Sequence, residues 1–139
     1  MSGIIIPLFE QRHLDFSYLA GAASEILTLH TALPVVPYKS GVLMLRIHEK
    51  NVGATPAKFL LRLYPTLPCK TDGRQFTNTA LAIAEIEVNS ASPSGPSYLH
   101  ADITTVTAAY LLVQLHISQA TSQTTLTAQL SAELVLRED

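Results

Sequence analysis

The sequence is poor in cysteine, tryptophan and charge. A single cysteine, Cys69, stands among 139 residues, so a disulfide cannot form within the chain and a disulfide-stapled secreted scaffold is excluded. Tryptophan is absent, and charged residues make up 14% of the chain, well below the roughly 25% of an average soluble domain. Hydrophobic residues make up 47%, which is typical of one folded domain and not of a disordered chain.

Features that direct a protein to nucleic acid or to a membrane are also missing. The formal net charge of -2 gives no overall attraction to nucleic acid or to an anionic membrane surface. No apolar run approaches the roughly 18 residues that span a bilayer, and residues 1–7 lack the basic segment of a signal peptide. We therefore expect synthesis in the cytoplasm, with neither nucleic acid nor a membrane as partner.

The sequence lacks the motifs that mark common active sites. It holds no nucleophile elbow, phosphate-binding glycine loop, zinc-ligand spacing or dinucleotide fingerprint. The weak candidates for a metal or catalytic site are His100 and Asp102, which share one face of a predicted strand, with His116 as a third group if it lies on a neighbouring strand. We expect ordinary solvated strand residues here, and a protein that is not an enzyme and needs no cofactor.

Alternation with a period of two dominates the sequence from residue 26 onward, and it indicates half-buried β-strands. The clearest example is the C-terminal segment, where one face is apolar and the other carries Thr, Gln, Ser, Glu and Arg. A helix would scatter these leucines around its circumference, so a strand is favoured. The apolar face consists of Leu126, Ala128, Leu130, Ala132, Leu134 and Leu136.

Similar alternation predicts strands over 27–30, 43–48, 59–64, 81–88, 99–104 and 110–118. The short polar linker 119–123 predicts that the last two strands pair as an antiparallel hairpin, and the composition of 89–96 predicts a loop. Seven or eight strands at this spacing favour an all-β fold, a two-sheet antiparallel β-sandwich of jelly-roll type over residues 25–139.

Residues 1–24 are expected to form an N-terminal arm or a short helix packed on the sandwich. The segment 11–25 is the one plausible helix, although Gly21 weakens it, and it could equally be an arm lying over the sheet. The segment 4–9 could be an edge strand, because Pro7 cannot donate to a central ladder.

The polar faces of the predicted strands are built from Thr, Ser and Gln, with few of the charges that deter association. Leu112 and Val135 interrupt these faces with apolar side chains. Such faces suit burial against another copy, so we expect a homo-oligomer, with a trimer favoured; the alternative is a monomer with an unusually neutral surface. The apolar N-terminal run is expected to anchor in a neighbour through Ile4, Ile5, Ile6, Leu8 and Phe9.

A compact, Thr/Ala/Leu-rich sandwich with an apolar N-terminal arm and a long Thr/Gln alternation ending at Leu136 resembles the small β-sandwich structural proteins of tailed phages and phage-like particles. The resemblance implies a non-enzymatic structural protein that self-associates and docks onto a larger assembly. It also implies incorporation into a virion or phage-like particle in a capsid-decorating, spike or connector role, with a protein partner there. No functional residue is transferred from the resemblance.

Two other functions remain open from the sequence. A ligand- or carbohydrate-binding β-sandwich would need exposed aromatic side chains for stacking, and the candidates are Tyr38, Tyr64, Tyr98 and Tyr110. An enzyme on a cupin-like or glycosidase-like scaffold would use the His100, Asp102 and His116 set, but a cupin ordinarily has more clustered histidines.

Overall fold

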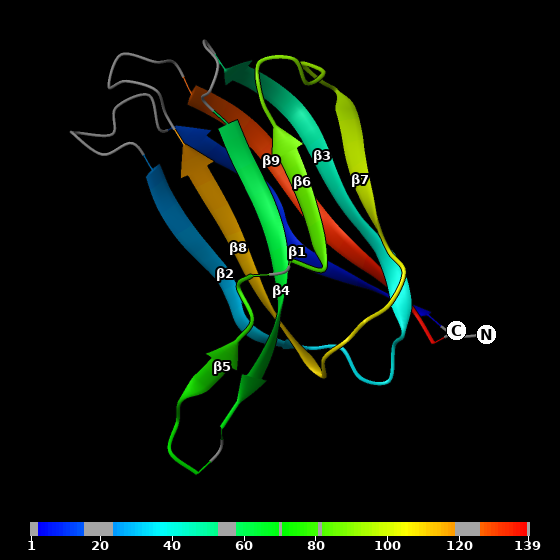
Figure 1. Ribbon diagram of the computed structural model, residues 1–139. Helices are drawn as coiled ribbons and strands as arrows, with labels where there is room; N and C mark the ends of the chain where they lie inside the picture. Colours follow the sequence, from blue (N-terminus) through cyan, green and yellow to red (C-terminus); the bar gives the residue numbers. More distant parts are fainter. Residues whose placement is uncertain are drawn as a thin grey trace.

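The computed structural model describes residues 3–15, 24–52, 58–69, 71–80, 82–118 and 126–138 (Figure 1). This part of the chain folds into strands with no helix, which confirms the all-β prediction, and it contains no helix of the length and hydrophobicity that crossing a bilayer requires. The strands are β1 (Gly3–Asp15), β2 (Ser24–Pro34), β3 (Ser40–Val52), β4 (Lys58–Pro68), β5 (Gln75–Thr77), β6 (Ala84–Val88), β7 (Ser97–Ile103), β8 (Tyr110–Ser118) and β9 (Leu126–Arg137).

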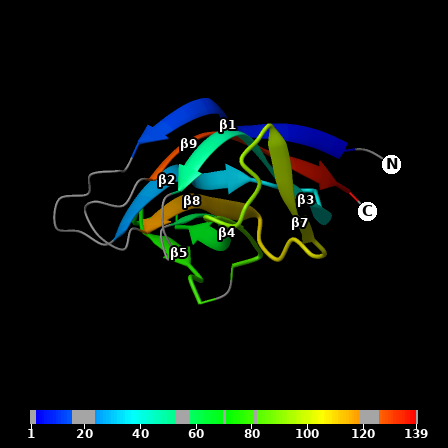
Figure 2. The same cartoon turned by 90° about the horizontal axis from the view of Figure 1, so that it is seen from above.

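The strands form two antiparallel sheets that pack as two layers (Figures 1 and 2). The four-stranded sheet has the order β1-β9-β3-β7. The five-stranded sheet has the order β2-β8-β4, and both β5 and β6 pair with the remaining edge of β4. This arrangement confirms the predicted two-sheet sandwich.

The winding of the chain is that of a jelly roll. Strands taken from the two ends of the chain pair in nested order, β1 with β9, β2 with β8, β3 with β7 and β4 with β6. Successive pairs belong to alternate sheets, as in a long antiparallel ribbon rolled around a core. The contacts of β9 with β3 and of β8 with β4 complete the two sheets.

The core lies between the sheets and is made from the inward residues of each alternating strand. The predicted apolar faces of β8 and β9 point into it, with Val113 and Leu134 fully buried among them. Burial of each such side chain stabilises the fold by about 1.5–3 kcal/mol. The largest fully buried side chains are Phe59, Leu43, Leu45, Ile47, Leu61, Leu63, Ile103, Leu111, Leu115, Ile117 and Leu130.

The N-terminal segment is a strand where the structure describes it, and not the short helix that was one of the two expectations. Residues 11–15 continue β1 along β9 and residues 24–25 begin β2, so the helix prediction for 11–25 is wrong where the structure describes it; residues 16–23 lie outside the described part. Pairing with β9 gives this backbone a ladder of partners and buries Leu14 in the core, which a weak helical pattern does not offer. The register shifts between Pro7 and Phe9, where proline supplies no N–H.

The predicted hairpin between the last two strands is also wrong. Strand β8 lies in the five-stranded sheet between β2 and β4, whereas β9 lies in the four-stranded sheet between β1 and β3. Alternation determines which side chains face the core, but both sheets share that core, so it does not determine which strand lies next to which.

Candidate functional site

Three apolar side chains form a row across the outer face of the four-stranded sheet. Ile5 of β1 is the register partner of Val135 of β9, which in turn is the partner of Val42 of β3. Their chain neighbours Leu43 and Leu134 face the core, so the row faces outward. Ile5 is 60% exposed, and Val42 and Val135 are partly exposed. We call these three residues the apolar row.

Charged and polar groups flank the apolar row on the same face. Arg46 donates from Nη2 to Oε1 of Glu133 at 2.7 Å, and Nε2 of His48 lies 2.9 Å from Oγ of Ser131. Met44 is the register partner of Glu133 and extends the apolar surface toward β7. An apolar centre with a polar rim is the usual anatomy of a protein interface.

A groove of about 360 Å³ lies between β3 and β7 on this face. The side chains of Met44, Pro96 and Tyr98 give it an apolar lining, and Tyr98 is 59% exposed. Because Met44 follows Val42 on the outward side of β3, the groove continues the apolar row. The complete lining is Met44, Arg46, Ile47, His48, Pro96, Ser97 and Tyr98.

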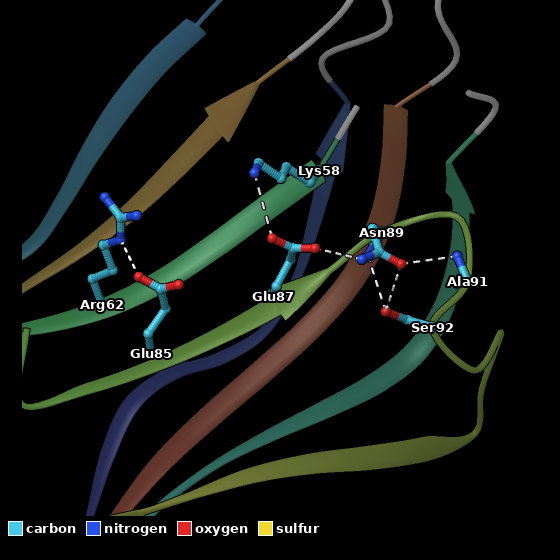
Figure 3. A network of polar contacts seen from close by, with 7 residues as sticks. All are labelled: Lys58, Arg62, Glu85, Glu87, Asn89, Ala91 and Ser92. Carbon is cyan, nitrogen blue, oxygen red and sulfur yellow. Dashed lines mark hydrogen bonds and ion pairs between the residues drawn. The ribbon is translucent and has the colours of Figure 1, made fainter. Parts of the chain in front are cut away.

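The loop 89–96, which carries one wall of the groove, is held by polar contacts (Figure 3). The Asn89 side chain donates to Glu87 at 2.5 Å and accepts the backbone N–H of Ala91 at 2.9 Å. Nζ of Lys50 on β3 donates to the carbonyl of Asn89 at 2.6 Å. The Asn89 amide and then Lys58, 3.4 Å away, lower the pKa of Glu87, although desolvation opposes them. Contacts within the chain therefore hold the loop that carries the groove wall.

Gly95 brings this loop onto the edge of β3. Its φ of +98° lies in the region that favours glycine. A Cβ at this position would lie 2.5 Å from the carbonyl oxygen of Ile47, a backbone atom that cannot easily move away. Glycine is therefore required for the close approach that places Pro96 beside β3.

A second apolar group lies on a hairpin that projects from the sandwich (Figure 1). This projecting hairpin consists of the end of β4, β5 and the turn between them, and the structure describes it over 66–69 and 71–77. Leu67 and Phe76 are register partners on one of its faces, and they are 62% and 54% exposed. The Arg74 guanidinium lies 5.7 Å from the centre of the Phe76 ring, within cation–π range.

Polar contacts on the opposite face fix the projecting hairpin in place. The hydroxyls of Thr66 and Thr77 lie 2.7 Å apart, and Nε2 of Gln75 donates to Oγ1 of Thr66 at 2.8 Å. Gln75 also donates to the carbonyl oxygen of Thr31 on β2. These contacts cover Thr66, which is 2% exposed, whereas Leu67 and Phe76 lie on the other side of the hairpin.

The turn at the tip of the hairpin contains a close ion pair. Asp72 accepts both the backbone N–H of Arg74, at 3.0 Å, and its Nε, at 2.8 Å. These bonds lower the pKa of Asp72. At the base of the turn, Sγ of Cys69 lies 3.2 Å from the Thr71 hydroxyl, which lowers the pKa of the thiol.

The outer face of the five-stranded sheet carries a continuous chain of polar side chains across four strands. The distances between successive polar atoms are 2.5, 3.3, 3.4, 3.1 and 3.3 Å. Each group thus has a partner within the sheet, and the arrangement cross-links β6, β4, β8 and β2. In this order, the members are Glu85, Arg62, Tyr64, His116, Gln114 and Thr28. Figure 3 shows the first ion pair.

The surroundings of His116 in this polar chain shift its pKa. Partial burial lowers its pKa, the positive charge of Arg62 lowers it further, and Glu85 opposes both. The imidazole is therefore neutral near pH 7 and acts as a hydrogen-bonding link. A polar cavity of about 150 Å³ lies at the other end of the polar chain, lined by Arg62, Tyr64, Thr79, Ala80, Ala82 and Glu85.

The structure does not bring the candidate metal ligands together. His100 and Asp102 lie on β7 in the four-stranded sheet, whereas His116 lies on β8 in the other sheet, and they face opposite sides of the sandwich. Within the described ranges, no three His, Cys, Asp or Glu side chains are grouped so that they could hold a metal ion. The tyrosines are likewise dispersed, and Tyr64 is buried while Tyr38 packs against the core.

The predicted interface residues divide into two groups. Leu8 lies in the core, where Ile6 and Phe9 pack against it, and Leu112 is 9% exposed beside its register partner Tyr64. The premise that the N-terminal run has no partner strand is wrong, because β1 pairs with β9. The residues that remain on the surface are Ile4, Ile5 and Val135.

Several residues of the site were not predicted, among them four apolar ones on the two exposed apolar groups. Val42 and Met44 are apolar residues on the outward side of an alternating strand, which is the same signal that identified Val135. Leu67 and Phe76 can be identified as an exposed pair only when the strand pairing is known. The one signal in the sequence is Phe76, an aromatic residue between the polar residues Gln75 and Thr77.

No protein-family model and no curated protein matches this sequence. Among solved structures, a chain in the structure of infectious bursal disease virus, Gx strain, has a similar fold, with a TM-score of 0.52 and 11% sequence identity. The similarity covers 97% of this chain and 31% of that chain. This chain therefore spans about a third of the length of the viral chain whose fold it shares.

Proposed function

We propose that this protein is a non-enzymatic structural component of a virion or phage-like particle that self-associates and docks onto a larger assembly. The observation that carries the proposal is the apolar row of Ile5, Val135 and Val42 on the outer face of the four-stranded sheet. Interfaces between permanent partners are depleted of charge at their centre and apolar there, as this row is.

Burial of the row would supply the driving force for association. Each large apolar side chain removed from water contributes about 1.5–3 kcal/mol, before the entropic cost of association is subtracted. The row starts at β1, the edge strand of its sheet, so a neighbour can approach without displacing another element of the described chain. Among closed assemblies we favour a trimer.

The shared fold with a chain of a virus structure supports a place within a virion. Decorating, spike and connector-associated roles are the finer forms of this proposal, and they come from the resemblance to tailed-phage proteins. The similarity to infectious bursal disease virus gives tailed phages no particular support. The absence of catalytic motifs in the sequence favours a role without enzymatic activity.

Light scattering behind size exclusion, at two protein concentrations tenfold apart, tests self-association. We expect a mass that is a whole multiple of the 15.1 kDa chain and is the same at both concentrations. A mass of one chain at both concentrations would overturn the proposal.

A second candidate function has one specific observation in its favour. Tyr98 is an exposed ring beside a groove of about 360 Å³, with Arg46 and His48 as hydrogen-bonding groups, and such a site can stack and bind a sugar. A glycan array probed with the wild-type protein and with Tyr98→Ala tests it. Binding that is lost in the variant would support a carbohydrate module, and no binding above background would reject it.

A further inference from the structure

We propose that residues 3–7 of β1 pair antiparallel with the same residues of a second copy, along the side of β1 that faces away from β9. We call this side the open edge. The twofold axis of the pair passes through Ile5. The inference rests on the proposed self-association and adds to it a second contact, at the edge of the four-stranded sheet.

The backbone of the open edge has hydrogen-bonding groups without a strand to pair with. β1 pairs with β9 on one side, and no described strand pairs with its other side. A Cβ on Gly3 would lie 2.7 Å from the carbonyl oxygen of Leu136, so this carbonyl points toward β1. Ile4, the register partner of Leu136, therefore directs its N–H and C=O toward β9. Because these groups alternate along a strand, those of Gly3, Ile5 and Pro7 point to the open edge.

The end of the open edge agrees with the local sequence. Pro7 has no N–H to donate, and a proline fits into a strand where the ladder does not need that group, as on an unpaired side. The next residue already has a partner within the chain, because Nε2 of His30 on β2 donates to the carbonyl oxygen of Leu8 at 3.2 Å. The open edge therefore ends at Pro7.

The open edge lacks the features that usually prevent strands of different molecules from pairing. Soluble proteins commonly place charged side chains on their edge strands or keep these strands very short. Residues 3–9 carry no charge. The other edge strands of the described sheets carry Asp102 on β7, Glu25 on β2, and Glu85 and Glu87 on β6, while β5 has only 3 residues. Among these edges, β1 is thus the one that is suited to pairing.

The backbone groups of the open edge are complementary to those of a second copy. When two copies lie antiparallel with Ile5 opposite Ile5, the N–H of each Ile5 donates to the C=O of the other. The N–H of each Gly3 donates to the C=O of the opposite Pro7. The missing N–H of Pro7 falls at the end of the pair, where water can bond to the carbonyl of Gly3.

The side chains of the open edge also match those of a second copy. In this register Ile5 lies opposite Ile5 on the outer face, and Ile4 lies opposite Ile6 on the inner face. Ile5 is 60% exposed and Ile4 is 41% exposed, so both have surface to bury. Apolar pairs directly across two strands stabilise a sheet. The contact joins the apolar rows of two copies end to end, so the occupant that fits this edge is a second β1.

The edge contact is weak alone and is strengthened by the contact of the apolar row. A few backbone hydrogen bonds contribute little after water has been displaced, and association has its own entropic cost. A trimer held by its apolar rows presents the open edge on each of its chains, and repeated contacts between the same two partners strengthen one another. We therefore expect two trimers joined by their open edges, six chains in all.

Light scattering of Ile4→Lys tests the edge contact without changing the apolar row. We expect the mass of the assembly to fall by half, because a lysine on an edge strand opposes pairing. Ile26→Lys is the matched control, since Ile26 is 54% exposed on β2, an edge strand of the other sheet, and this variant should keep the wild-type mass. Circular dichroism and thermal unfolding confirm that both variants are folded.

A disulfide trap tests the register. The protein carries Ile5→Cys with Cys69→Ser and is exposed to mild oxidation. The Cα atoms of a hydrogen-bonded antiparallel pair lie about 5.5 Å apart, within the range that a disulfide spans. We expect a covalent homodimer, because the twofold axis places this position opposite itself. Ile26→Cys with Cys69→Ser is the control and should give little product.

The outcomes separate this inference from the proposed function. A wild-type mass of one chain at both concentrations rejects self-association itself. A wild-type mass of three chains, an Ile4→Lys mass equal to that of the wild type, or a trap without homodimer rejects the edge contact and leaves self-association in place. A halved mass in Ile4→Lys together with the homodimer supports both.

Discussion

The outer faces of the two sheets arise from the same alternating pattern but differ in what their side chains contact. On the five-stranded sheet, the polar chain from Glu85 to Thr28 gives each member a partner within the molecule. On the four-stranded sheet, the apolar row remains partly exposed to water in the described part of the chain. An outward-facing side chain is thus not always a polar one with a hydrogen-bonding partner.

This difference indicates which face would lower its free energy more when a partner covers it. A second protein that covers the polar chain gains little, because these side chains already bond to one another and covering them only removes water from polar groups. A protein that covers the apolar row removes apolar surface from water, which is the main favourable term in association. The outer face of the four-stranded sheet is therefore where we place the proposed association.

The largest expected effect separates two adjacent residues of β9. Leu134→Ala should lower the free energy of unfolding by about 2–5 kcal/mol, because Leu134 is fully buried between the sheets. Val135→Ala, on the outward side, should cost about 1 kcal/mol or less when both variants are monomeric. Urea unfolding at low protein concentration measures both, and equal losses would contradict the assignment of inner and outer faces.

A second comparison concerns the groove on the four-stranded sheet. Gly95→Ala should destabilise the fold by about 2–3 kcal/mol, since it adds a backbone clash to an unfavourable φ. Gly73→Ala is the matched control, because Gly73 has a φ of +73° but open space around its Cβ position, so about 1 kcal/mol is expected. If the two substitutions cost the same, the close approach of the loop to β3 is refuted.

A smaller effect is expected on the polar chain. Tyr64→Phe removes the hydroxyl that links Arg62 to His116 and should lower the free energy of unfolding by about 1 kcal/mol. The assembly mass should not change, because this face is not the proposed interface. A changed mass in light scattering would show that the five-stranded sheet also takes part in association.

The smallest effect is a pH dependence. The folded state lowers the pKa of His116 below its ordinary value of 6.5, so the folded protein binds the proton less readily than the unfolded chain does. Stability from this group is therefore complete above pH 6.5 and decreases as the pH falls from 6.5 toward the lower folded-state pKa. Thermal unfolding between pH 7.5 and 5 should show a smaller loss of stability in His116→Gln than in the wild-type protein. Identical pH profiles would exclude His116 as a source of the pH dependence.

The sequence predicted the faces of the strands well and their neighbours poorly. Alternation identified the buried sides of β8 and β9 because burial acts on every second residue of a strand. It could not show that β8 and β9 lie in different sheets, since that depends on contacts between distant segments. For the same reason, alternation could not show that Leu67 pairs with Phe76. It also predicted an exposed Leu112, whereas in the structure Tyr64 lies beside Leu112.

Only part of the candidate site was predicted, because the sequence shows single outward apolar residues but not which strands bring them together. Val135 was identified as an apolar residue out of place on a polar strand face, and the structure joins it to Ile5 and Val42. Leu8 is buried because it lies on the same side of β1 as Ile6, whose register partner is the core residue Leu134, as a period of two indicates. The prediction assumed that the N-terminal run has no partner strand, and alternation alone does not show that β1 pairs with β9.

The most direct test of the central claim is one light-scattering comparison of Val135→Asp with Ile26→Asp. Both changes place a carboxylate on an outward apolar position, one on each sheet, and an unpaired charge is costly to bury in an interface. We predict that Val135→Asp has the mass of a single chain while Ile26→Asp keeps the mass of the wild-type assembly. An assembled Val135→Asp protein, or loss of assembly in Ile26→Asp alone, would contradict the placement of the interface on the four-stranded sheet.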